Sequence, residues 1–202
     1  MANSDSPFGF RPVMHKSGAP YNGSVNLYMA TCGTSLFPGD PVLITGESNA
    51  TEIDGNGPGT VPIVNVVGTN DTSAISGVIN SVVPTTNQSA LYYAGTKTNT
   101  LVWVCDDPDV LFEVQADAAL TQDDVGMATK LLNTHAGSTN TGRSGAEVDA
   151  TVATQGVFVV ERLVPRADNE LATANPKVWV SVRKHTKNAS GARVSALGVG
   201  IA

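Results

Sequence analysis

Short β-type segments separated by turn-forming residues constrain this chain most, and the clearest pair lies within residues 101–115. Residues 101–105 are apolar and rich in β-favouring side chains, and residues 110–115 alternate between apolar and polar, as strands do. The turn between them contains Asp106, Asp107, Pro108 and Asp109. Proline has no N–H for a strand ladder and aspartate bonds to nearby backbone, so we expect a β-hairpin here.

The turn of this expected hairpin is acidic. Residues 101–129 contain no lysine or arginine, so its three aspartates have no basic neighbour in the sequence. The spacing is not that of a calcium loop with a closing glutamate, and turn formation explains the aspartates better than metal binding does. We expect an acidic rim that meets a partner.

Other strand patterns recur along the chain at short spacing. They cover residues 25–30, 42–45, 61–67, 75–83, 91–94, 156–164 and 177–186. The polar loops between them are longest at residues 46–59 and 135–145, and a capping-box pattern at residues 121–124 predicts a short helix. The fold expected is mainly β: a single domain of β-barrel or β-sandwich type with at most one or two short helices.

The N-terminal residues 1–24 have no strand or helix periodicity, yet they are too apolar for a solvated tail. We expect an extended arm that lays its aromatic side chains onto a surface, either its own domain or a neighbouring molecule. The β domain then covers residues 25–186, and residues 187–202 form an irregular tail. Truncation of residues 2–14 is expected to leave the domain folded.

Charge argues against two classes of partner. The chain of 202 residues has a formal net charge of −6, whereas a general binder of nucleic acid or of an anionic membrane needs a positive face. Basic residues concentrate in residues 162–193, which form either a solvated tail or a basic end that meets an acidic surface on another subunit. No secretory signal or membrane-spanning run is recognised, so we expect synthesis in a reducing cytoplasm.

Motifs that carry chemistry are weak in this chain. Cys32 and Cys105 have no metal-type spacing and are expected to be buried thiols, with a disulfide left open. The segment 137–144 resembles a phosphate loop, but Arg143 replaces the lysine and no strand–loop–helix context surrounds it. The three histidines stand in unrelated settings, with no zinc or triad pattern. We expect no enzyme activity, no cofactor and no metal.

Several segments, taken in order, resemble the small head decoration, or cement, proteins of tailed bacteriophages. They are residues 6–12 (SPFGFRP), 39–42 (GDPV), 104–115 (VCDDPDVLFEVQ), 124–126 (DVG), 166–171 (RADNEL) and the last strand through His185. The resemblance implies a β-barrel-like domain, commonly a homotrimer, on the outer surface of the capsid in the virion. There it binds the major capsid protein and clamps neighbouring subunits against internal pressure. No catalytic residue is carried over.

Candidate contact residues follow from this hypothesis. In the arm they are Phe8, Phe10, Arg11 and Pro12, in the acidic turn Asp106, Asp107 and Asp109, and on the last strand Trp179 and Arg183. One alternative is a head-fibre or tail-associated adhesion module that recognises a host surface glycan through loops 46–59 and 135–145. A hydrolase would require His135 or His185 beside an aspartate in a deep pocket.

Overall fold

The computed structural model describes residues 3–31, 33–69, 73–84, 91–96, 99–133, 136–151 and 156–187. Its strands are β1 (Arg11–His15), β2 (Asn26–Ala30), β3 (Pro41–Ser48), β4 (Pro62–Val66), β5 (Gly77–Val82), β6 (Thr100–Cys105), β7 (Val110–Gln115), β8 (Ala128–Thr129), β9 (Leu131–Leu132), β10 (Glu147–Val148), β11 (Phe158–Leu163) and β12 (Lys177–Val182). The single helix within these ranges is a 3₁₀ turn, η1 (Gln122–Asp124). The expectation of a mainly β fold with a barrel is confirmed.

Five strands form a closed barrel in the order β2-β4-β3-β5-β6. The β2–β4 contact is parallel, and the other contacts in the barrel are antiparallel. Alternate residues point into the barrel, because side chains of a strand alternate between its two faces. Tyr28, Val64, Val102 and Val104 belong to the buried interior cluster.

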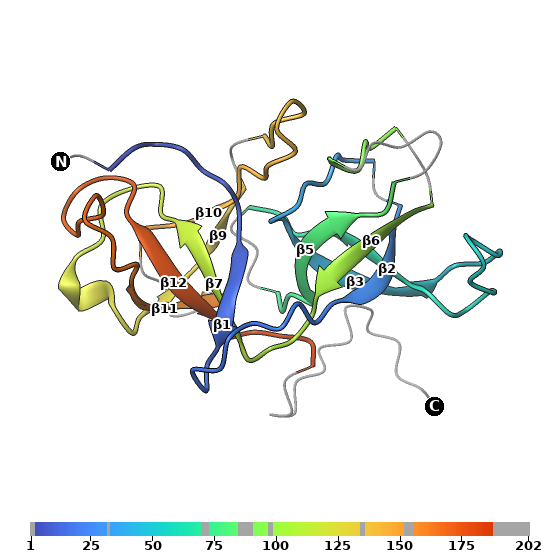
Figure 1. The fold of residues 1–202 in the computed structure, drawn as a ribbon, viewed down its shortest axis with the longest axis horizontal. Coiled ribbons are helices and arrows are strands. Elements are labelled where there is room, and N and C mark those ends of the chain that lie inside the picture. The colour runs from blue at the N-terminus through green and yellow to red at the C-terminus, as the bar shows by residue number, and fades with distance from the viewer. Residues whose placement is uncertain are drawn as a thin grey trace.

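A second sheet has the order β1-β7-β12-β11-β8, and β9 pairs with β10 beside it. The apolar faces of β7 and β12 are buried, with Phe112 and Val180 each about 1% exposed or less. Figure 1 shows this sheet beside the barrel, with β1 on the barrel side. The core under the sheet also contains Val78 and Cys105 from barrel strands, so both units share continuous apolar packing.

The expected β-hairpin at residues 101–115 is wrong. Both strands exist, but β6 pairs with β2 and β5 in the barrel, whereas β7 pairs with β1 and β12 in the second sheet. The acidic turn therefore carries the chain from one β unit to the other. Alternation of apolar residues identifies strands without identifying their partners, which is why the sequence pattern misled here.

The N-terminal segment lies on the chain's own fold. Residues Arg11–His15 form β1 and pair with β7, with an irregularity between Pro12 and Met14. Phe10 is 1% exposed, and its ring stacks on Phe158 with centroids 4.5 Å apart. The segment is thus an integral part of the second sheet.

The predicted short helix is confirmed as η1. The backbone N–H of Thr121 donates to Asp124 Oδ2 at 2.7 Å, and both halves of the capping box are present. Gly126 follows with φ +87°, a left-handed conformation that ends the turn at low cost for glycine. The strand expected at residues 91–94 is reduced to one bridge, between Leu36 and Tyr93.

Candidate functional site

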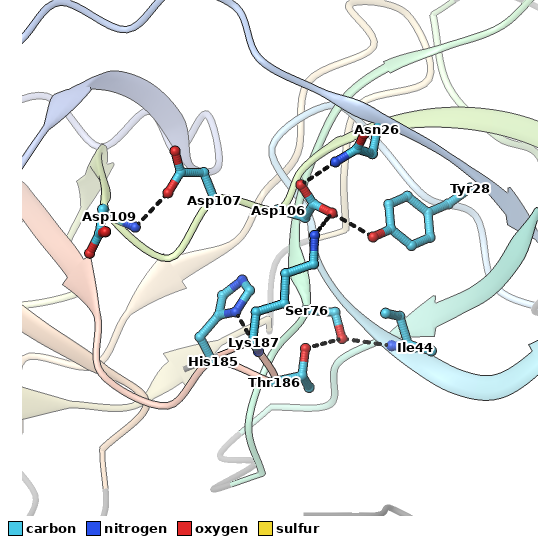
Figure 2. A network of polar contacts seen from close by, with 10 residues as sticks. All are labelled: Asn26, Tyr28, Ile44, Ser76, Asp106, Asp107, Asp109, His185, Thr186 and Lys187. Atoms are coloured by element: carbon cyan, nitrogen blue, oxygen red, sulfur yellow. Dashed lines mark hydrogen bonds and ion pairs between the residues drawn. The ribbon is translucent and has the colours of Figure 1, made fainter. Parts of the chain in front are cut away.

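A buried polar junction joins the barrel to the second sheet, and Asp106 lies at its centre (Figure 2). Asp106 is 5% exposed and accepts hydrogen bonds from Asn26 Nδ2 at 2.8 Å and Tyr28 O–H at 2.6 Å. It also pairs with Lys187 Nζ. Burial alone would raise the pKa of Asp106, but the hydrogen bonds from Lys187, Tyr28 and Asn26 outweigh it and lower the pKa.

The segment after β12 completes this junction. The backbone N–H of Thr186 donates to Ile75 O at 2.9 Å, and its hydroxyl donates to Ser76 Oγ at 3.1 Å. His185 is 3% exposed, and its Nδ1 accepts from the backbone N–H of Lys187 at 3.0 Å. Burial, and then the charge of Lys187, lowers the pKa of His185 to about 4. The junction therefore holds a neutral imidazole and a charged carboxylate at neutral pH.

The three aspartates of the expected acidic rim all have partners within the chain. Asp107 lies 3.5 Å from His15 Nδ1, and Asp109 lies 3.8 Å from Lys16 Nζ. With Asp106 buried against Lys187, only the outer part of the turn remains available to a partner. The sequence made these aspartates look unpaired because their partners lie far away along the chain. The partners come from the N-terminal segment and from the region after β12.

The arm residues line a shallow groove of 210 Å³ between β1, the barrel and the 137–145 loop. Its lining consists of Phe8, Phe10, Arg11, Pro12, Pro38, Gly39, Ile79, Asn80, Gly142 and Arg143. We call this the N-terminal groove. Phe8 and Phe10 are buried, at 7% and 1% exposure, and so belong chiefly to the fold. The more accessible contact candidates are Arg11 and Pro12.

Two guanidinium groups give the N-terminal groove a positive character in an acidic protein. Arg11 lies over the ring of Phe8, with Cζ 4.3 Å from its centroid. Burial lowers the pKa of Arg11, and the charge of Arg143 lowers it further. The nearby carboxylate of Glu113 pairs with Arg166 at 2.9 Å. No carboxylate in the described ranges lies within ion-pair distance of Arg143.

Close backbone packing builds the floor of the groove. Gly9 has φ +74°, and a Cβ there would lie 2.5 Å from Ser144 Cβ and 2.9 Å from Gly39 O. The N–H of Phe10 donates to Gly39 O at 2.9 Å. Only glycine fits this crossing, because a side chain would clash and the backbone conformation would be strained. The N-terminal segment, the barrel and the 137–145 loop are thereby fixed against one another.

A buried carboxylate secures the same crossing. Asp40 accepts hydrogen bonds from Ser144 Oγ at 2.5 Å and from the N–H of Phe37 at 2.8 Å. Burial raises the pKa of Asp40 to about 6, although both hydrogen bonds oppose the rise. Because Ser144 bonds to Asp40, its hydroxyl serves the fold, and the phosphate-loop interpretation of segment 137–144 gains no support.

Trp179 and Arg183 each have a contact within the chain. Trp179 is half-buried, and the guanidinium of Arg162 lies 4.1 Å above its ring. Arg183 is exposed, and its Nη1 donates to Gly156 O at 3.4 Å. The strand alternation correctly predicted that both side chains leave the apolar core. It could not reveal that Arg162 covers the indole.

The loop at residues 46–59 borders a second pocket, of 380 Å³. Met29, Ile53 and Ile63 give it apolar walls, and Glu47 and Asn99 are among its polar lining residues. The pocket is therefore a mixed apolar and polar hollow on the barrel. Its described lining includes no aromatic ring.

Three further observations on the described ranges concern metal ions, membrane-spanning helices and cysteines. No group of three or more His, Cys, Asp or Glu side chains is placed to hold a metal ion there. No helix in that part of the chain has the length and apolarity to cross a bilayer. Cys105 is a buried free thiol, whereas Cys32 and His135 lie outside the described residues.

Comparison with known proteins returned no match to a protein-family model, a curated protein or a solved structure.

Proposed function

We propose that this chain is a non-enzymatic virion structural protein, a decoration or cement protein that binds the outer surface of the major capsid lattice and stabilises the head. The observation that carries the proposal is the N-terminal groove. Residues 6–12, which resemble the start of the phage decoration proteins, bring Arg11 and Pro12 to a preformed surface beside Arg143. Two guanidinium groups beside apolar walls suit a protein segment that carries a carboxylate.

The groove is fixed before any partner arrives. Its floor is the crossing of Gly9 and Gly39, and Asp40 holds the loop that carries Arg143 through Ser144. A rigid site loses little conformational freedom on binding, so more of the contact energy appears as affinity. On a shell, many copies multiply a modest contact, and binding only to the expanded shell stabilises that state.

The test is rebinding of purified protein to shells stripped of it. Arg143→Glu reverses the charge of one groove wall and is expected to lower occupancy at least tenfold, whereas Lys130→Glu makes the same charge change away from the groove. Arg143→Lys keeps the charge and should retain part of the binding. Full occupancy with Arg143→Glu, or no binding of the wild-type protein to shells, would refute the proposal.

The alternative, a head-fibre or tail-associated adhesion module for a host glycan, has less support. It requires a recognition surface at loops 46–59 and 135–145. The pocket beside the first loop has apolar walls but no aromatic ring among its described residues. Ligand pockets are commonly lined by aliphatic and aromatic side chains together. A glycan that protects residues 46–59 from hydrogen exchange would favour this alternative.

A further inference from the structure

An exposed apolar pair lies beside η1, at the edge of the second sheet that is far from the N-terminal groove. Val125 is 40% exposed and Met127 is 47% exposed. Asp123 precedes them and is exposed, with no hydrogen bond or ion pair to any described residue. We call residues 123–127 the acidic-apolar turn. Among the described residues, Val125 and Met127 are two of the four large apolar side chains that are exposed, and they lie two residues apart beside the unpaired carboxylate of Asp123.

The acidic-apolar turn is held in a fixed shape. The N–H of Gly126 donates to Val160 O at 2.7 Å, and the N–H of Val160 donates to Met127 O at 3.0 Å. Asp124 accepts from the backbone N–H of Thr121 at 2.7 Å. Because these bonds anchor the turn to β11 and to η1, its exposed side chains are presented without a large ordering cost.

The composition of the turn complements that of the N-terminal groove. The groove offers the apolar surfaces of Pro12 and Ile79 together with the guanidinium groups of Arg11 and Arg143. The turn offers an apolar pair and one unpaired carboxylate, that of Asp123, since the carboxylate of Asp124 is hydrogen-bonded to Thr121. Arginine binds carboxylates through its planar fork of donors, and apolar area on both sides adds the hydrophobic contribution.

Within one chain these two surfaces lie at opposite edges of the second sheet. The groove is beside β1 and the turn is beside β8, the two end strands in the order β1-β7-β12-β11-β8. Figure 1 shows η1 as the yellow turn at the left end of the molecule and β1 in its middle. A contact between turn and groove therefore joins two copies, and it is head-to-tail, since each copy contributes a different surface.

We propose that the acidic-apolar turn of one copy docks into the N-terminal groove of a second copy, with Asp123 between Arg11 and Arg143. The segment that fills the groove then belongs to a second copy, so Arg143→Glu lowers shell occupancy by breaking the link between copies; the proposal rests on the proposed function only in taking the groove as a protein-binding surface. A head-to-tail contact closes into a ring if its rotation closes, and otherwise extends into a chain. On a shell, it would link neighbouring copies to one another.

The test is a charge exchange monitored by sedimentation velocity over a concentration series of the full chain at low salt. Asp123→Lys and Arg143→Glu are each expected to weaken self-association about tenfold. The double variant Asp123→Lys/Arg143→Glu restores opposite charges between residues 123 and 143 and is expected to recover part of the loss, because Arg11 still repels the new lysine. Asp168→Lys reverses the charge of another exposed acidic residue, outside the turn and the groove, and should have little effect.

Three results would overturn the inference: a wild-type monomer throughout the series, single variants that associate as the wild type does, or a double variant that is no better than the singles. Circular dichroism of each variant shows whether a loss reflects unfolding.

The outcomes separate this inference from the proposed function. Shell binding that is lost with Arg143→Glu but not recovered by the double variant, in a protein that stays monomeric, would assign the groove to a capsid subunit and overturn the inference alone. Recovery of self-association by the double variant, in a protein that never binds shells, would support the inference and refute the capsid role.

Discussion

Two buried ionisable side chains, Asp40 and His185, respond to pH in opposite directions. Folding raises the pKa of Asp40 from 3.8 to about 6, so the folded state binds this proton more tightly and its stability falls as pH rises through that range. Folding lowers the pKa of His185 from 6.5 to about 4, so its contribution is present above 6.5 and is lost as pH falls. Each shift corresponds to about 3 kcal/mol.

Because the two windows overlap, we expect the unfolding free energy of the wild-type protein to change little between about pH 4 and pH 6.5. Asp40→Asn removes the acid that opposes stability at higher pH, so the free energy should rise with pH. His185→Gln removes the group whose contribution is lost at low pH, so the free energy of unfolding of this variant should fall as pH rises. Urea denaturation at several pH values measures both slopes, and identical slopes in the two variants would contradict this account.

The crossing of Gly9 and Gly39 gives a second test at the residue scale. Gly9→Ala places a Cβ 2.5 Å from Ser144 Cβ in a backbone with φ +74°, and we expect a loss of about 3 kcal/mol or more in unfolding free energy. Gly23→Ala is a matched control, with φ +80° and no atom within 4 Å of the added Cβ. It should cost only about 1 kcal/mol. Equal losses in chemical denaturation would show that the crossing is not tightly packed.

Asp106 and Asp109 belong to one turn but have different environments. Asp106→Ala leaves Tyr28 and Asn26 without their acceptor and Lys187 without its charge partner. We expect a loss of about 3–5 kcal/mol. Asp109 is exposed, so Asp109→Ala should change the unfolding free energy by less than about 1 kcal/mol. Thermal denaturation of the two variants measures this difference in stability. Similar melting temperatures would exclude a structural role for the junction.

At the scale of elements, alternation in the sequence predicted most strands of the barrel and of the second sheet. It missed β1, because Pro12 and the irregularity beside it break the period. It also missed β8, β9 and β10, which have two residues each and no measurable periodicity. Strand partners could not be predicted, since β6 and β7 look like a hairpin yet belong to different sheets.

The candidate site was predictable only in part. The N-terminal residues were recognised as apolar and in need of a surface, and Arg11 and Pro12 do line a groove. The second guanidinium group of the groove belongs to Arg143, which lies in a loop that the sequence marks only as polar. Likewise, Lys16 and Lys187 approach the acidic turn from distant positions. Such convergence depends on the tertiary fold, and no local pattern encodes it.

Deletion of residues 2–14 tests the role of the N-terminal segment as an element. It removes most of β1 and Phe10, and thereby exposes the edge of β7 and the ring of Phe158. We expect loss of the cooperative thermal transition and a tendency to aggregate. A truncated chain that melts as sharply as the full chain would restore the expectation of a detachable arm.

At the scale of the whole molecule, two β units are joined by a shared apolar core and a buried polar junction (Figure 2). The groove lies where the N-terminal segment, the barrel and the 137–145 loop meet. A rigid body of this kind transmits force between the molecules that it contacts, because packed interiors deform little. This suits a protein that holds a lattice together by contact.

The most direct test of the central claim is the number of copies of this chain in each purified virus particle, measured by quantitative mass spectrometry against the major capsid protein. The cement account predicts copies on the order of hundreds, in fixed proportion to capsid subunits, because its stabilisation depends on many repeated contacts. A handful of copies per particle, or none, would contradict it.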